Sequence, residues 1–218
     1  MAARELLAEL AGEYQRLGGP PVLAQAAGGV DVAKRVQAGE ALDVVVLSRS
    51  AIDKLEAEGK TLAGSRDLAG SGVAVAVRAG AARPDISNEE ALKAAVLAAT
   101  SLAYSTGPSG VHLQKTFARW GILDAIRNRI RVAPPGVPVG SLVARGEAEL
   151  GFQQLSELMN LSGVQVLGPL PEPVQTLTVF SGAIAASSTR AAEARALLEF
   201  LAAPAALAAK QRHGMQAP

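Results

Sequence analysis

The stretch Tyr104-Ser105-Thr106-Gly107-Pro108-Ser109-Gly110-Val111-His112 joins an apolar segment to an amphipathic one. Residues 102–104 read as the end of a strand, and the apolar residues of 111–122 recur at helical spacing. Small polar residues and glycines leave backbone N–H groups uncovered where the helix begins, and the helix dipole there favours an anion. The joint therefore indicates an α/β fold with an anion-binding loop at Thr106, Ser109, Gly110 and Val111. The alternative is an ordinary turn whose serine caps the helix.

Similar joints occur at residues 25–30 (QAAGGV) and 134–139 (PPGVPV), and each precedes a helical pattern. Helix N-termini of this kind suit convergence on one small ligand, so further candidate ligand-binding residues are Ala27, Gly28, Gly29 and Val137. None of the joints carries the G-x-x-x-x-G-K-[ST] or G-x-G-x-x-G pattern, so a nucleotide ligand is not expected.

Composition narrows the function classes. The 218 residues can form one large domain or two small ones. The net charge of +1 comes from 21 basic and 20 acidic residues, without the basic block expected of a nucleic-acid partner. No apolar run approaches the roughly 20 residues that span a bilayer, so the chain is not predicted to be membrane-embedded. With no cysteine and only two histidines, disulfides, thiolate metal sites and His-rich metal clusters are excluded, and no cofactor is predicted.

Apolar segments and helical patterns alternate along the chain. Continuous apolar strands between helices indicate a mainly parallel sheet covered on both faces. Strands are expected at 21–24, 43–47, 73–77, 102–104, 130–132 and 150–153, with further apolar segments at 164–167 and 177–186. Helices are expected at 3–17, 32–38, 52–57, 89–99, 111–120, 139–145, 191–201 and 205–212.

Five segments together resemble the periplasmic molybdate-binding family, the solute-binding proteins of ABC transporters. They are 36–48 (VQAGEALDVVVLS), 108–110 (PSG), 143–151 (VARGEAELG), 168–171 (GPLP) and 197–204 (LLEFLAAP). The resemblance implies a type II periplasmic-binding fold with two α/β lobes, each a mainly parallel sheet flanked by helices. Lobe I would combine residues 1–77 and 176–218, and lobe II would be residues 78–175.

The same resemblance implies a small anionic ligand in an interlobe cleft, an ABC transporter permease as partner, and a periplasmic location. In the family, a first strand precedes the helix that begins here near Ala2, and this chain starts without a signal peptide. We therefore expect a physiological form that is extended upstream. If the start is genuine, the location would be cytoplasmic.

The expected cleft residues differ from those of oxyanion-binding members. Residues 26–29 read Ala-Ala-Gly-Gly where the family has hydroxyl residues, and Gln153 and Gln154 stand where it often has a tyrosine, followed by Glu157. Amides and a carboxyl suit a larger, less symmetric ligand than a tetrahedral oxyanion. A molybdate-like oxyanion and a small organic carboxylate both remain as ligand classes. One glutamine is expected to be a cleft donor, while the other pairs with backbone.

Three further residues are candidates, and two of them have a second interpretation. Ser48 and Arg49 follow a buried strand at the end where α/β proteins usually bind ligands. The Arg49 guanidinium suits a carboxylate, or it is a solvated surface group. His112 lies one turn into its helix, where a structural role is favoured over a catalytic one.

The candidate residues and the family resemblance leave two functions open. The first is a receptor that closes on an anion and delivers it to a transporter. The second is an enzyme on the same scaffold that resembles aconitate isomerases, with Glu157 and His112 as candidate acid–base groups. The absence of a recognised base motif favours the receptor.

Overall fold

The computed structural model describes residues 1–134 and 136–218 and divides into two compact units. Unit 1 contains residues 1–71 and 178–218, and unit 2 contains residues 72–177. Strand β2 (Arg66–Arg78) contributes its first part to unit 1 and the remainder to unit 2. The two-lobe boundaries expected from the sequence, near 78 and near 175, stay a prediction.

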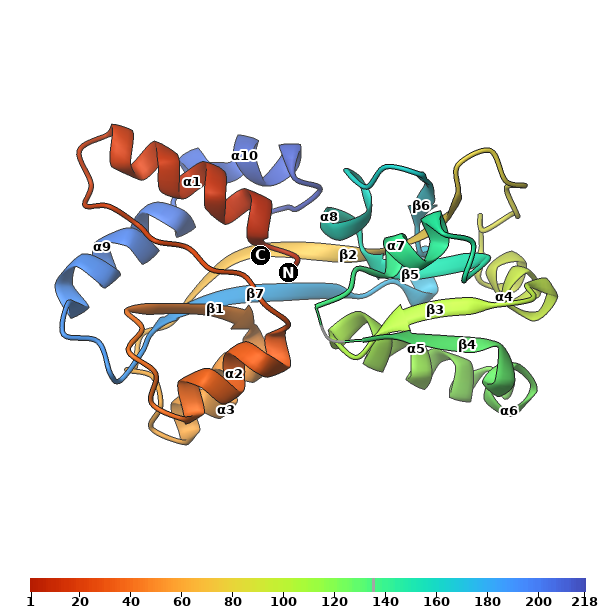
Figure 1. Cartoon of the computed structure of the whole chain (residues 1–218), viewed down its shortest axis with the longest axis horizontal. Helices are drawn as coiled ribbons and strands as arrows, with labels where there is room; N and C mark the ends of the chain where they lie inside the picture. Colours follow the sequence, from red (N-terminus) through yellow and green to blue (C-terminus); the bar gives the residue numbers. More distant parts are fainter. Residues whose placement is uncertain (135) are drawn as a thin grey trace. The chain divides into compact units, whose positions relative to one another are not determined.

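Unit 1 is built around strand β1 (Val44–Ser48), which pairs antiparallel with β7 (Leu177–Ile184), and β7 in turn neighbours β2 (Figure 1). Successive side chains of β1 point to opposite faces of the sheet. Val45 and Leu47 therefore join the core beneath α2 and α3, while Val46 packs against the core of the terminal helices. The helices of this unit are α1 (Arg4–Arg16), α2 (Gly29–Gln37), α3 (Arg49–Ala57), α9 (Ala191–Ala202), the 3₁₀ turn η3 (Pro204–Ala206) and α10 (Leu207–Arg212).

Unit 2 contains a sheet in the order β6, β2, β5, β3, β4. Its strands beyond β2 are β3 (Leu102–Ser105), β4 (Ile130–Ala133), β5 (Leu150–Gln154) and β6 (Val164–Pro169). Its helices are α4 (Glu89–Ala98), α5 (Pro108–Arg119), α6 (Leu123–Ile126), α7 (Val139–Ala144) and α8 (Leu155–Leu158), with the 3₁₀ turns η1 (Arg127–Arg129) and η2 (Glu172–Val174).

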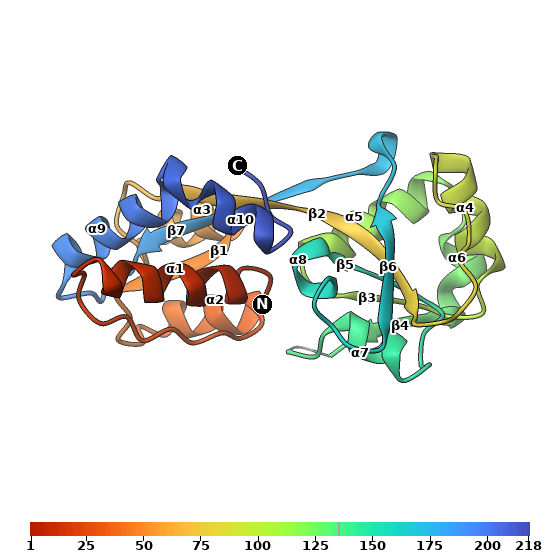
Figure 2. The same ribbon diagram turned by 90° about the horizontal axis from the view of Figure 1, so that it is seen from above.

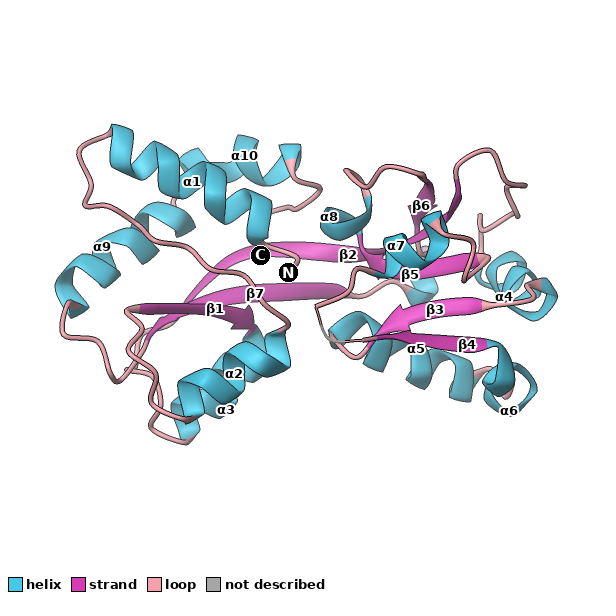
Figure 3. Cartoon of the chain, viewed as in Figure 1, coloured by secondary structure: helices cyan, strands magenta, loops and turns pink. Residues whose placement is uncertain are grey.

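Helices cover both faces of the unit 2 sheet, as Figures 2 and 3 show for α5 and α7. The alternation of side chains along β3 explains this arrangement. Leu102 and Tyr104 belong to the core that contains Phe117 of α5, whereas Ala103 belongs to the core of Val139 and Val143 in α7. A strand buried on both faces must be apolar at every position, as residues 102–104 are.

The α/β class is confirmed, and two expectations about strands are wrong. Residues 21–24 form no strand; they begin with Pro21, which has no N–H to donate to a sheet. The sheets are mixed rather than mainly parallel: β3 runs parallel to β4 and β5, but β2 runs antiparallel to β5 and β6, and β1 to β7. A continuous apolar run predicts that a strand is buried on both faces, but it does not predict the direction of that strand.

Among the helices of the described residues, none has the length and apolar character needed to cross a membrane.

Candidate functional site

One edge of the unit 2 sheet gathers the starts of three helices. Strands β3, β4 and β5 are parallel, so their carboxyl ends lie at the same edge. Helix α5 begins after β3, α7 begins after β4, and α8 follows β5 directly. The predicted joints at 104–112 and 134–139 therefore reach the same edge as the glutamine pair. Pro135, within the second joint, lies outside the described residues.

The start of α5 combines a buried hydroxyl with a close backbone approach. Ser109 is buried as the second residue of α5. A Cβ on Gly110 would lie 1.7 Å from the Ser105 carbonyl oxygen, so glycine lets α5 pass directly over the end of β3. Gly110 thus has a packing role, whether or not its N–H also meets a ligand.

Two other residues of this joint are placed differently. The N–H of Val111 donates to the Gly107 carbonyl at 3.1 Å and so closes the first turn of α5. Thr106 is exposed in the turn before the helix. By helix geometry, the N–H groups of Ser109 and Gly110 are the ones without a carbonyl partner in the preceding turn.

A hydrogen-bonded chain connects α7, β5 and α8. The backbone N–H of Val139 donates to Oε1 of Gln153 at 2.8 Å, and Nε2 of Gln153 donates to Oε2 of Glu157 at 2.6 Å. Gln153 is 3% exposed. A Cβ on Gly151 would lie 2.4 Å from Cγ2 of Val143, so the glycine allows α7 to pack tightly on β5. This packing places the first residue of α7 within reach of the Gln153 amide.

Glu157 is the candidate acid–base group of this edge. Burial raises the pKa of its carboxyl, while the positive charge of the Met1 amino group and, after it, the hydrogen bond from Gln153 oppose that shift. A carboxyl with a raised pKa can take up and return a proton.

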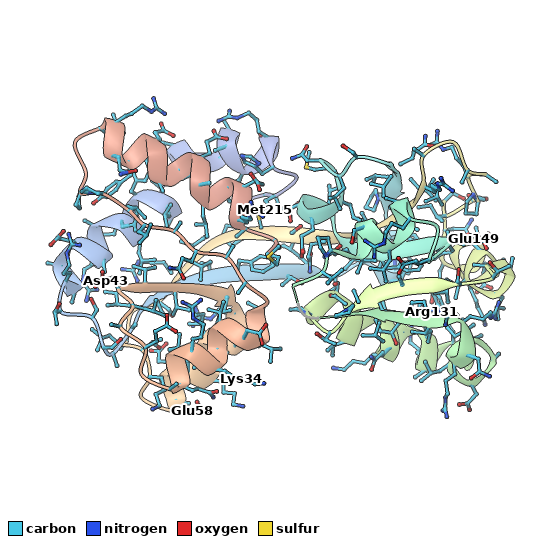
Figure 4. All side chains as sticks on the ribbon, in the orientation of Figure 1. Lys34, Asp43, Glu58, Arg131, Glu149 and Met215 are labelled. Carbon is cyan, nitrogen blue, oxygen red and sulfur yellow. The ribbon has the colours of Figure 1, made fainter. Side chains whose placement is uncertain are left out.

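Glu149, labelled in Figure 4, marks the opposite end of the same strands. It precedes β5 and accepts from the backbone N–H and the hydroxyl of Thr100, which precedes β3, at 2.8 and 2.7 Å. The carboxylate at the amino ends of β3 and β5 therefore supports the sheet, while Glu157 lies at the carboxyl ends.

The remaining candidates of unit 2 have local structural contacts. His112 Nε2 lies 2.7 Å from the Val174 carbonyl, which accepts its proton and ties α5 to η2. The N–H of Val137 donates to the Pro134 carbonyl at 3.0 Å and closes the turn before α7. Gln154 is buried as the last residue of β5, opposite Val73 of β2.

The candidates at 27–29, 48 and 49 belong to unit 1. Ala27 and Gly28 precede α2, and Gly29 is its first residue. Ser48 ends β1, and its hydroxyl lies 3.5 Å from that of Ser50.

Arg49 is committed to carboxylates of its own unit. Its guanidinium donates to Asp53 at 2.6 and 2.8 Å and to Asp67 at 3.2 Å. The side chain therefore joins α3 to the start of β2, and an added carboxylate would compete with both aspartates.

Sequence reasoning missed the Val139 N–H as a partner of the site. The signal was available, because Pro138 directly precedes a helical pattern and the first N–H of a helix has no partner within it. Which side chain would meet that N–H depends on how α7 packs on β5, and the sequence does not specify that packing. In the described residues, no group of three or more acidic or histidine side chains could hold a metal ion.

Comparison with known proteins gives three kinds of likeness. The family model of bacterial extracellular solute-binding proteins matches residues 1–216. Aconitate isomerase from Pseudomonas sp is 43% identical over 187 residues, which cover 85% of this chain and 71% of that protein.

Solved structures share the fold. The periplasmic molybdate-binding protein of Azotobacter vinelandii has a TM-score of 0.81 at 23% identity, covering 100% of this chain and 96% of its own. The sulfate-binding protein SubI of Mycobacterium tuberculosis H37Rv has a TM-score of 0.75 at 17% identity, covering 98% and 82%.

Proposed function

Since the chain belongs to the family of bacterial extracellular solute-binding proteins, we propose that it binds a small tricarboxylate of the aconitate type and moves a proton within it. The observation that carries the proposal is the half-buried Glu157 carboxyl, with a raised pKa and one oxygen held by Gln153, in a chain 43% identical to an aconitate isomerase. The sequence alone favoured a receptor. The 43% identity to an aconitate isomerase now favours the enzyme.

The chemistry needs one group that takes up a proton and gives it back. Aconitate has a methylene carbon beside its carbon–carbon double bond. The Glu157 carboxylate removes a methylene proton, breaking that C–H bond, and the electron pair forms a new double bond to the central carbon. The old double bond gives its pair to the former vinyl carbon, which receives the proton from Glu157. The carboxylate is restored, no electrons are gained or lost, and the new double bond forms in either geometry.

The start of α5 is suited to hold a carboxylate of such a ligand. The N–H groups of Ser109 and Gly110 point out of the helix end, where the dipole favours negative charge. The Ser109 hydroxyl adds a donor at the same place. Binding at this edge would leave the carbon chain of the ligand to reach Glu157.

A second candidate function is a solute receptor without turnover. The family model and the fold shared with molybdate- and sulfate-binding proteins support it. In that case the ligand is a small anion, the partner an ABC transporter permease and the location the periplasm. Glu157 would then tune affinity.

A ligand screen with a turnover assay tests the proposal. Thermal unfolding should shift upward with cis- or trans-aconitate, because a ligand at 100-fold its Kd adds about 2.7 kcal/mol. Molybdate and sulfate should give smaller shifts, and chelators should leave aconitate binding unchanged. Either aconitate isomer should be converted to the other. Tight binding of molybdate without binding of aconitate would contradict the proposal.

A further inference from the structure

The Gln153 side chain is fixed from both ends. Its Oε1 accepts the Val139 N–H at 2.8 Å, and its Nε2 donates to Glu157 Oε2 at 2.6 Å. The residue is buried, so water does not compete readily for either contact. Both bonds lie within unit 2.

The Val139 N–H decides which way the amide points. A backbone N–H only donates, so the atom facing it must be the amide oxygen. Val139 is the first residue of α7, and its N–H has no carbonyl partner within that helix. A flipped amide would leave this buried donor facing an NH₂ group and would turn an oxygen toward the Glu157 carboxylate. The backbone of α7 therefore forces an N–H of Gln153 toward Glu157.

We propose that Gln153 is a positioning residue for proton transfer: its amide, oriented by the first N–H of α7, holds one oxygen of Glu157 and keeps the carboxylate ready to act as base. The inference rests on the proposed function and names the residue that helps to set the pH dependence of turnover.

Within unit 2, no titratable side chain belongs to the elements packed around Glu157. Helix α8 packs against α7, β5 and β6, which read VGSLVA, LGFQQ and VQVLGP. None of these elements carries an acidic, basic or histidine side chain. Burial raises the pKa of the Glu157 carboxyl, and the positive charge of the Met1 amino group and, after it, the Gln153 donor lower it. Of the two groups that lower this pKa, Gln153 is the one that unit 2 supplies.

The test replaces Gln153 with methionine, which keeps length and volume but removes the amide. Without its donor the carboxylate is less stable, so Glu157 should hold its proton to higher pH. The acid limb of the kcat/KM profile should move up by about one pH unit, since a hydrogen bond to a charged group is of that size. On this acid limb kcat should fall by up to about tenfold, with KM changed less than about twofold. Gln165→Met on β6 is the matched control and should leave the profile unchanged.

A second variant guards against simple misfolding. The exchange Gln153→Glu with Glu157→Gln keeps an acceptor for the Val139 N–H and a donor opposite it, so it should fold. It moves the carboxylate to position 153 and should lose turnover. Retained turnover in this exchange would overturn the inference.

A readout without substrate separates this inference from the proposed function. Carbon NMR of the Glu157 carboxyl should show its titration moved upward in Gln153→Met. An unmoved titration would overturn the role of Gln153, even if the parent protein converts aconitate. A parent protein without turnover would overturn the proposed function, and the NMR titration would still decide the role of Gln153.

Discussion

Gly110 shows how a single residue supports the candidate site. Its missing side chain lets α5 begin against the Ser105 carbonyl, where a Cβ would lie 1.7 Å from the oxygen and 3.1 Å from Tyr104 Cδ2. The 1.7 Å contact would join the helix backbone of α5 to the backbone of Ser105, so no flexible side chain could move aside to relieve it. The position of the Ser109 hydroxyl and of the first N–H groups of α5 therefore depends on this glycine.

Gly110→Ala is expected to destabilise the protein by about 1–3 kcal/mol, the usual effect of overpacking a tight contact. Chemical unfolding followed by circular dichroism measures the change. Gly12→Ala is the matched control: it lies in α1, with no atom within 4 Å of its added Cβ. This change should stabilise by about 0.5–1 kcal/mol, because alanine is the better helix former. Equal effects of the two substitutions would show that the contact at Gly110 does not matter.

At the scale of elements, α1 and α10 of unit 1 lie side by side (Figure 2). Glu9 of α1 pairs with Arg212 of α10, and His213 Nε2 lies 2.7 Å from Glu9 Oε2. The hydrogen bond from Arg212, and after it that from His213, lowers the pKa of Glu9. One carboxylate thus joins the helices at the two ends of the described chain.

Glu9→Gln should lower the free energy of unfolding at neutral pH by up to about 1 kcal/mol, a value limited by the partial exposure of the pair. Because the folded-state pKa is lowered, the contribution of Glu9 is present above its unfolded value of 4.5 and is lost as pH falls through the folded value. The difference between parent and variant should therefore shrink progressively as pH falls below 4.5. Unfolding at several pH values measures this, with Glu13→Gln on the same helix as control. A difference that does not shrink as pH falls would contradict the ion-pair explanation.

Most elements could be predicted from the spacing of apolar residues along the sequence. The apolar residues of 139–145 recur at helical spacing and correspond to α7, and the continuous apolar run 150–153 corresponds to β5. Strand direction could not be predicted, because an apolar run such as 73–77 is equally buried in either orientation. The expected strand at 21–24 was wrong because the prediction relied on the apolar composition of the segment. Pro21 lacks the N–H donor that pairing in a sheet needs.

At the scale of the whole molecule, the candidate residues divide between the two units. Ser109, Gly110, Gln153 and Glu157 share one sheet edge of unit 2, while Arg49 and residues 27–29 belong to unit 1. The sequence could identify the unit 2 residues because each stands where an apolar strand meets a helical pattern. It could not assign their roles, since the Gln153 contacts depend on packing between α7 and β5. That the candidates of unit 1 and those of unit 2 contact one ligand stays a prediction, which follows from the expected two-lobed arrangement.

The proposed role of Glu157 as base is tested most directly by the interconversion of aconitate isomers by the parent protein and by Glu157→Gln, followed by proton NMR. The parent should convert trans- to cis-aconitate, and the variant should lose about 10²–10⁴-fold in turnover while its affinity changes little. Glu147→Gln, an exposed carboxylate paired with Arg145 in the same unit, is the control and should keep full turnover. Full turnover in Glu157→Gln would show that this carboxyl is not the base, and no turnover in the parent would leave a receptor in place of the enzyme.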